Sequence, residues 1–467
     1  MLQFEHSGLK LCDGVTRREW LRLGSLTAAG LTLPEFYAAQ ARAADNQAPA
    51  RNATAKACIQ MFLWGGPGQQ ETWDLKPEAP AGTRGAFTPI DTSVPGFQIC
   101  EHLPLMAQRA HKYTIVRSLT HTGINHGTSA YHMLTGHLHW SPGTLRHPTR
   151  NDMPNIGCNA ARFLTHPDHL PANVQLPAII NDGDALAVPG QEPGILGEKH
   201  VPFRVLGDLT QKDFQVPSLK LAAGLSAGRL ERRVSLREAI DGHLSHLAME
   251  QNGRAVDSSY ERAASLLSSP KTQAAFDLSR EPAALREKYG KHNFAQSLLL
   301  ARRLVEAGVP FVTVYWNWPN NSDDQSWDTH ADQHRRMGKH LLPAFDQGVS
   351  AFLDDMISRG LLDETLVTWY GEFGRTPKIN SQGGRDHWGF CQSIGLAGGG
   401  VTPGLAYGTS TRDGGYADTL PVTPDDLSAT IFHCLGIDGR QHMHDNLGRP
   451  IQLSFGEPVR DILSSHG

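Results

Sequence analysis

Short apolar runs rich in β-branched and aromatic residues recur along the chain, and each is followed by glycine or polar residues. Runs of this length, bounded by turn residues, are typical of buried strands. The pattern predicts four clear strands and one weaker, strand-like run at Leu176–Ile180. The four clear strands are Cys58–Trp64, Tyr113–Arg117, Phe311–Trp316 and Leu366–Tyr370.

Charged and apolar residues recur at helical spacing in other parts of the chain. This pattern is strongest from about residue 219 to residue 307, where it predicts several helices. These helices either shape a substrate pocket as an insertion or cover one face of a sheet, and the pattern does not decide between the two. Amphipathic patterns predict further helices at Leu341–Arg359 and Pro424–Ile437. The second contains the glycine that is common at a helix end.

The polar residues after the last predicted strand form the strongest candidate site. Glu372 stands between two glycines at the carboxyl end of that strand, where open α/β sheets bind their ligands. Arg375 and Lys378 follow, and a glycine turn then leads to Asp386 and His387. A carboxylate and an imidazole that converge on one sheet edge suit a divalent metal. The alternative is a surface loop with ordinary salt bridges.

A second polar cluster follows the strand that ends at Trp316. It alternates carboxylates and imidazoles and contains Asp328, His330 and His334. His330 and His334 are four positions apart and share one face if a helix begins here. Such spacing suits a metal whose imidazole ligands are fixed by nearby carboxylates. The alternative is a capped helix, with Asp328 as its N-cap and His334 on a solvent-exposed face.

Two further groups of polar residues follow earlier strands. His121 and His126 flank a glycine where a helix is expected to begin, and the backbone N–H groups of a helix N-terminus hold anions. Thr128 either caps that helix or faces a substrate. Glu71 and Asp74 follow the glycine turn after the first strand and are candidate ligands, although Asp74 fits a turn or a helix cap equally well.

Composition sets the outer limits of the interpretation. The 467 residues are 39% hydrophobic and 19% charged, so the chain can bury a large core in two or three domains or in one large α/β domain. A net charge of −4 without a long basic block gives no indication of nucleic-acid binding. The 6 cysteines have no CxxC spacing, which argues against a thiolate zinc site and a dense disulfide framework. No apolar run reaches the length of a membrane span.

The N-terminus has the pattern of an export signal. Arg17 and Arg18 form a twin-arginine pair, a moderately apolar stretch follows at Leu23–Leu33, and residues 41–43 fit a cleavage site. The pattern resembles a bacterial Tat leader, which directs folded and often metal-loaded proteins to the Tat machinery. We therefore expect residues 1–44 to be a signal peptide and the mature protein to be periplasmic or extracellular. The alternative is an amphipathic first helix of the mature domain.

Six motifs together resemble the uncharacterised bacterial family called domain of unknown function 1501. They are the twin-arginine leader, Gly65-Gly66-Pro67, His121–Gly136, Trp327–His330, Gly371–Pro377 and Arg385–Trp388. The family is grouped with the alkaline phosphatase and sulfatase superfamily. This resemblance implies a single α/β domain over residues 45–467, with a doubly wound, mostly parallel sheet flanked by helices. It also implies metal-dependent hydrolysis or transfer of phosphate or sulfate esters.

Carried over residue by residue, the resemblance implies one well-formed metal site and a second that is rebuilt or absent. The position of the superfamily's nucleophile is occupied here by His126, so a covalent phospho- or sulfo-enzyme loses its usual attachment point. The aspartate that usually ends the first strand is replaced by Trp64 or Gly65. At the late strand the usual Asp-His or Asp-Asn pair becomes Glu372-Phe373. Asp328, a histidine of its cluster and His387 match the ligands of the other site.

Two functions remain open at this point. The first is an exported hydrolase of small-molecule or glycan phosphate or sulfate esters, in which zinc, manganese or calcium activates water. Its metal ligands are expected among Asp328, His330, His334, Glu372, Asp386 and His387. Arg375 would offset negative charge and His126 would act as general acid, general base or further ligand, with His121, Thr128 and Lys378 at the substrate. The second is a catalytically degenerate protein that binds metal or glycans, which the missing nucleophile favours.

Overall fold

The computed structural model describes residues 53–139, 147–182, 186–219, 265–316, 326–445 and 447–464, together with residues 228, 229 and 232. The predicted signal peptide, residues 1–44, lies outside the described residues, as does most of the stretch from 220 to 264. Within the described part of the chain, no helix is both long enough and apolar enough to cross a membrane.

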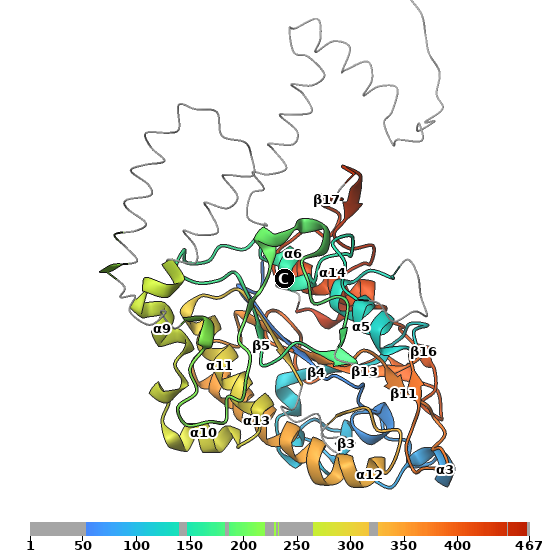
Figure 1. The fold of residues 1–467 in the computed structure, drawn as a ribbon. Helices are drawn as coiled ribbons and strands as arrows, with labels where there is room; N and C mark the ends of the chain where they lie inside the picture. The colour runs from blue at the N-terminus through green and yellow to red at the C-terminus, as the bar shows by residue number, and fades with distance from the viewer. Residues whose placement is uncertain are drawn as a thin grey trace, which may run out of the picture. The chain divides into compact units, whose positions relative to one another are not determined.

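Among the described residues, eight strands form a central sheet in the order β14-β4-β13-β10-β1-β9-β5-β8 (Figure 1). Only β13 runs antiparallel to its neighbours β10 and β4, and all other pairs in the sheet are parallel. The predicted mostly parallel α/β sheet is therefore confirmed, with all four clear strands inside it. The strands are β1 Ala57–Phe62, β4 Tyr113–Leu119, β5 Asn173–Leu176, β8 Phe203–Arg204, β9 Phe311–Tyr315, β10 Thr365–Tyr370, β13 Gln392–Ala397 and β14 Ala406–Tyr407.

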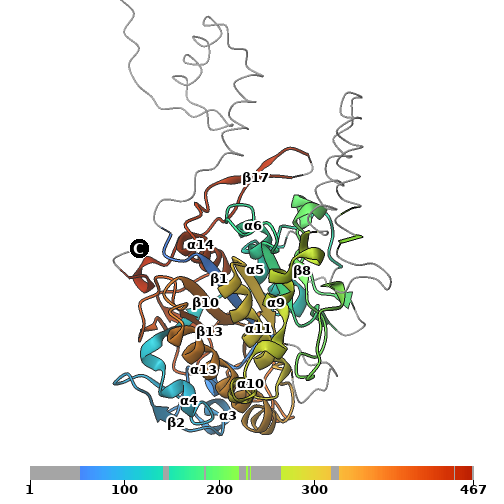
Figure 2. The same ribbon diagram turned by 90° about the vertical axis from the view of Figure 1, so that its left-hand side faces the viewer.

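Helices cover both faces of this sheet (Figure 2). Successive side chains of a strand point to opposite faces of the sheet, and the side chains of β1 alternate between the two cores in this way. Ile59 and Met61 belong to the core under α11 and α13. Cys58 and Phe62 belong to the core under α5, α6 and α14. The helices are α5 His126–Thr135, α6 Ile156–Ala160, α11 Asn293–Ala307, α13 Leu342–Ser358 and α14 Pro424–Cys434.

The described part of the predicted helical region at 219–307 is mostly helical. Its α-helices from residue 270 onward are α9 Pro270–Phe276, α10 Ala283–Tyr289 and α11. The longest, α11, packs directly against β9 and α13, while α9 and α10 pack against α11. In this part of the region, the helices therefore cover one face of the sheet.

His292 begins α11 and makes the fold sensitive to acid. Its Nδ1 accepts a hydrogen bond of 3.2 Å from the Phe294 N–H, and its ring packs on Trp316 at 4.7 Å. Burial lowers the pKa of His292 to about 3. Between pH 6.5 and 3 the unfolded chain therefore binds a proton that the folded chain excludes, so stability is lost as the pH falls.

Replacing His292 with asparagine, which also caps helices, is expected to remove this acid sensitivity. Urea unfolding at pH 8 and pH 5 should show that the loss of stability between these values is about 1–2 kcal/mol smaller in His292→Asn than in the parent. The variant's stability at pH 8 is expected to be lower, because the ring contact with Trp316 is gone. An unchanged difference between the two pH values would contradict the assignment.

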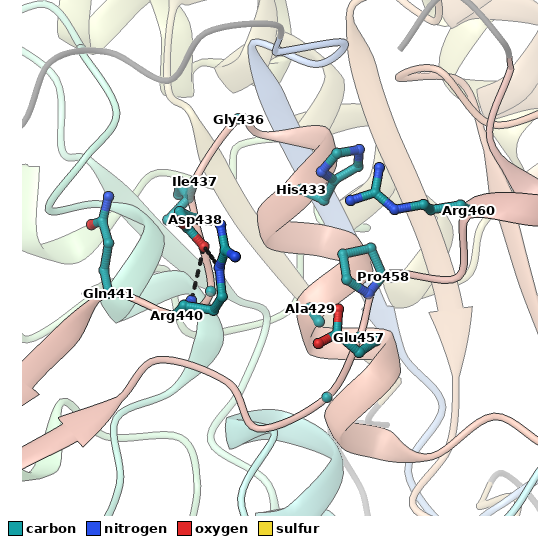
Figure 3. A pocket seen from close by; sticks show the side chains of 12 residues that line it. Ala429, His433, Gly436, Ile437, Asp438, Arg440, Gln441, Glu457, Pro458 and Arg460 are labelled. Atoms are coloured by element: carbon teal, nitrogen blue, oxygen red, sulfur yellow. Dashed lines mark hydrogen bonds and ion pairs between the residues drawn. The ribbon is translucent and has the colours of Figure 1, made fainter. Parts of the chain in front are cut away.

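A cavity of about 370 Å³ lies at the carboxyl end of α14 (Figure 3). Its lining includes His433 and Arg460, whose guanidinium points toward the imidazole. Thr54 and Ala55, which precede β1, donate backbone hydrogen bonds of 2.9 and 2.8 Å to the carbonyl of Cys434. The cavity therefore lies near the amino end of β1, at the edge of the sheet opposite to the predicted site.

Candidate metal centre

The predicted site residues follow strands that run in the same direction. Gly65 comes shortly after β1, His121 after β4 and Glu372 after β10. The carboxyl ends of parallel strands meet at one edge of a sheet, so these residues are brought together there. His126 opens α5, whose N-cap Asn125 accepts a side-chain hydrogen bond from the backbone of the first turn.

Three imidazole rings converge on the carboxylate of Asp328. The Nε2 atoms of His126, His330 and His387 lie 3.3, 3.2 and 3.1 Å from its oxygens. The Nε2 atoms of His330 and His387 lie 2.9 Å from one another. One ligand atom each from His126, Asp328 and His387 can be chosen so that all three lie within 4.8 Å of one another. The rings come from α5, from the segment after β9 and from β12 (His387–Trp388), so the tertiary fold assembles this group.

Each of the three rings uses its other nitrogen to donate a hydrogen bond. The acceptors are Glu372 Oε1 for His126 at 2.6 Å, Asp386 Oδ1 for His330 at 2.9 Å and the Ile124 carbonyl for His387 at 3.0 Å. A carboxylate and a carbonyl oxygen only accept, so the proton of each neutral ring is on Nδ1. The Nε2 lone pairs then face the Asp328 carboxylate and one another. Ligand histidines in metalloproteins are oriented in this way.

The nitrogen lone pairs and the carboxylate charge repel one another at these distances, so a cation between them stabilises the group. Burial alone lowers the pKa of His126, but its hydrogen bonds to Asp328 and Glu372 outweigh burial and raise that pKa to about 9. Burial alone raises the pKa of the Asp328 carboxyl, but hydrogen bonds from His126 and His387 and the charge of Arg375 hold it well below its usual range. Either a proton or a metal ion therefore fits at this position.

The donor set fits a divalent transition metal. Three imidazole nitrogens and one carboxylate oxygen suit zinc, manganese or iron, whereas calcium prefers six to eight oxygen ligands. His126, Asp328 and His387, whose ligand atoms all lie within 4.8 Å of one another, are the residues that would hold such an ion, and His330 is a further donor beside Asp328 and His387. Glu372 and Asp386, which are also predicted as ligands, accept the Nδ1 hydrogen bonds of His126 and His330.

Arg375 lies beneath this group and is fully buried. Its guanidinium donates to Asp328 Oδ1 at 2.6 Å and to the carbonyls of Gly66 at 3.0 Å and Trp327 at 3.2 Å. It also donates to the carbonyls of Arg385, at 3.0 Å, and Gly65. The structure thus places this predicted catalytic residue where it connects the chain segments of the centre and fixes Asp328.

Gly65 is required where β1 meets the centre. Its φ is +108°, and its N–H donates to Glu372 Oε1 at 2.9 Å. A Cβ at this position would lie 2.3 Å from the Asp328 nitrogen and 2.7 Å from the Trp327 carbonyl carbon. No neighbouring flexible side chain can relieve such a contact, because both atoms are backbone.

The substitution Gly65→Ala is expected to destabilise the fold by about 3 kcal/mol, because it adds backbone strain and overlap at a packed position. Gly82→Ala is the control, since a Cβ there meets nothing within 4 Å. Urea unfolding of both variants should show a clear loss in the first and a change within about 0.5 kcal/mol in the second. Equal effects would show that the close approach of β1 to Asp328 is absent in solution.

The residues predicted to face a substrate have different surroundings. His121 is buried, donates from Nε2 to the Glu372 carbonyl at 2.8 Å and accepts from the Gly123 N–H at 3.0 Å. Burial lowers the pKa of His121 to about 4, so it is a neutral support for the backbone of Glu372. Thr128 contacts Asn125 in the first turn of α5. Lys378 is exposed.

His334 does not join His330 at Asp328. The helix α12 (Gln333–Arg336) begins only after His330, and Asp332 before it has a φ of +47°, so the two histidines do not share a helical face. His334 Nε2 instead accepts from the Ala86 N–H at 3.0 Å and lies 3.7 Å from Glu71 Oε1. Glu71 itself is paired with the buried Arg385 at 2.6 Å.

Aromatic residues that were not predicted as part of the site enclose His126. Its ring lies 4.9 Å from that of Trp64 and 5.0 Å from that of Phe373, and the His387 ring stacks on Phe373 at 4.4 Å. The position of Trp64 after a strand and of Phe373 beside Glu372 was visible in the sequence. The backbone carbonyl of Ile124 left no comparable signal, because every residue has one.

One family model matches residues 55–463, and its description is "Protein of unknown function (DUF1501)". The chain belongs to the DUF1501 family. None of the curated proteins matches this DUF1501 chain. The resemblance found in the motifs is thereby confirmed at the level of the family.

Solved structures with some likeness to the DUF1501 chain include a phosphonate monoester hydrolase and a protein of the alkaline phosphatase superfamily. The crystal structure of Ps i-CgsB is 11% identical with a TM-score of 0.39, over 82% of this chain and 72% of that one. A phosphonate monoester hydrolase from Silicibacter pomeroyi is 13% identical with a TM-score of 0.37, over 78% and 72%. A protein of the alkaline phosphatase superfamily from Vibrio parahaemolyticus is 10% identical with a TM-score of 0.36, over 86% and 74%.

Proposed function

We propose that this protein is an exported, metal-dependent hydrolase of phosphate or sulfate esters. The observation that carries the proposal is the convergence of three imidazole Nε2 atoms on Asp328, each ring being fixed by an acceptor at Nδ1. A divalent metal held there would lower the pKa of water and offset the negative charge of an ester. The twin-arginine pattern of the N-terminus supports export.

In this proposal some residues are metal ligands, others orient those ligands, and one side of the centre is open to solvent. His126 occupies the place of the superfamily's nucleophile as a ligand, so water rather than a side chain is the attacking group in this proposal. The open side lies over His330 and Asp386, whose side chains are 40% and 57% exposed, whereas Glu372 is fully buried.

Lys378 adds positive charge at this open side. Thr376 Oγ1 contacts both the Lys378 carbonyl at 3.0 Å and the Asp386 N–H at 3.1 Å, which holds the two residues in one turn. In this proposal the exposed ammonium group would offset the charge of an anionic ester. Arg375 is a positioning residue in this proposal, because its donors already serve Asp328 and backbone carbonyls.

One observation favours the second candidate, a metal-binding protein without turnover. Four protein donors complete a tetrahedral zinc site, and structural zinc sites are closed in this way, whereas catalytic ones keep a position for water. The exposure of His330 leaves room for a further ligand and argues for the hydrolase.

The test is the metal content of protein purified through its export route, beside His387→Ala and Glu372→Ala variants. A near-stoichiometric metal in the parent that is lost in His387→Ala and weakened in Glu372→Ala would establish the centre. The metal-loaded parent is then assayed on 4-nitrophenyl phosphate and sulfate, with and without a chelator. Turnover that the chelator removes supports the hydrolase, and metal without turnover supports the second candidate. A parent without metal overturns both.

A further inference from the structure

Three aromatic rings pack together close to the candidate metal centre. Trp388 and Phe390 have ring centroids 4.9 Å apart, and the Tyr416 ring lies 5.6 Å from each of them. Tyr416 is 49% exposed, while Trp388 and Phe390 are half-buried. We call these three residues the aromatic cluster. Because the three rings pack on one another, the ring surface that is exposed to solvent is held in place.

The aromatic cluster lies at the same edge of the sheet as the centre. Trp388 follows His387 directly in β12, and the Phe390 carbonyl accepts from Thr120 Oγ1 at 3.0 Å, just after the end of β4. Tyr416 belongs to the loop between β15 (Thr409–Ser410) and β16 (Ala417–Thr419). Hydrogen bonds of Thr411 with the Tyr416 backbone close this loop.

The surroundings of the aromatic cluster are both apolar and charged. The Trp388 indole donates to the Gly415 carbonyl, and a Cβ on Gly415 would lie 2.8 Å from Pro377, so the turn that carries Lys378 borders the cluster. Lys378 is exposed and has no ion pair within the described part of the chain. On the side of the centre, Ile124 is 58% exposed while its carbonyl binds His387.

We propose that the aromatic cluster binds a sugar ring, so that the substrates of the centre are sulfated or phosphorylated saccharides. This inference rests on the proposed function, because the ester group is placed at the centre. The flat C–H faces of a sugar pack on aromatic rings, and rings that are already fixed lose little entropy on binding. Lys378 and the metal centre supply the positive charge that an anionic saccharide requires.

Other occupants fit this surface less well. A stable protein partner needs about 1,000 Å² or more of complementary surface, and three rings supply only a fraction of it. A membrane requires a broad apolar face, whereas the exposed residues Asp413, Asp418 and Thr419, close to Tyr416 in the chain, are polar. These residues instead match the hydroxyl groups of a saccharide.

The test is affinity electrophoresis in gels that contain dextran sulfate or unsulfated dextran, which requires binding but no turnover. The parent is expected to be retarded by dextran sulfate, and Tyr416→Ala is expected to bind about tenfold more weakly. Tyr416→Trp should bind as the parent does. Phe455→Ala is the matched control, because Phe455 is an exposed aromatic residue that lies on the loop after β18 (Pro450–Gln452), outside the cluster.

The outcomes separate this inference from the proposed function. Equal retardation of the parent and Tyr416→Ala shows that charge alone causes binding and overturns the inference, as does a parent that is not retarded. Metal content and turnover of 4-nitrophenyl esters are measured on the same preparations, and the metal content is expected to be unchanged in Tyr416→Ala. A parent without metal or without turnover would contradict the proposed hydrolase. The result of the affinity electrophoresis would still stand.

Discussion

A His330→Ala variant is expected to lose its metal, while His334→Ala is expected to retain it. The two residues are four positions apart and of the same type, yet only His330 directs its Nε2 toward Asp328, at 3.2 Å. The affinity for Zn²⁺, measured by competition with a chromophoric chelator, should fall by about 100-fold or more in His330→Ala, since even residues that only orient ligands cost 10–100-fold.

His334→Ala controls for the loss of an imidazole in this part of the chain. His334 packs against Phe87 at 5.2 Å and accepts from the Ala86 N–H, so its removal should lower stability slightly and leave the centre intact. Circular dichroism checks that both variants are folded. Equal loss of metal from the two variants would show that a helix does run from Asp328 through His334, as the spacing predicts.

The substitution with the largest expected effect on stability is Arg375→Met. Removal of the guanidinium leaves the buried side of Asp328 and several backbone carbonyls without their donor. Removing one partner of a buried ion pair lowers the free energy of unfolding by about 3–5 kcal/mol. Urea unfolding should therefore show a loss of this size, or the protein should fail to accumulate in folded form.

Lys378→Met provides the comparison, because Lys378 is exposed and its removal should change stability by less than about 0.5 kcal/mol. If Arg375→Met instead retained parental stability and lost only turnover, Arg375 would face the substrate, as its position in a glycine-framed loop after a strand predicts. Stability and turnover thus distinguish a positioning residue from a catalytic one.

The sequence was most informative where a strand ends. Glu372 directly follows an apolar run, Asp328 stands after another, and His387 follows a glycine turn in the same stretch as Glu372. The sheet brings the ends of such strands to one edge. The separation of His334 from His330 was not visible, since it depends on a backbone conformation at Asp332 that non-glycine residues rarely adopt. The burial of Arg375 was not visible either. A charged residue in a polar loop is usually exposed, and only the tertiary fold supplies the carbonyls that bind this one.

The ligands of the centre are far apart in the chain, and this has a consequence for how the protein matures. His126 leaves the ribosome long before Asp328, and His387 follows later still. A nascent chain that has not reached His387 cannot assemble the group, and the Gly65 carbonyl lacks its donor until Arg375 has been made. For the proposed hydrolase, metal uptake would therefore follow closure of the sheet. If the protein is exported in folded form, as proposed, the compartment in which the chain folds would decide which metal it receives.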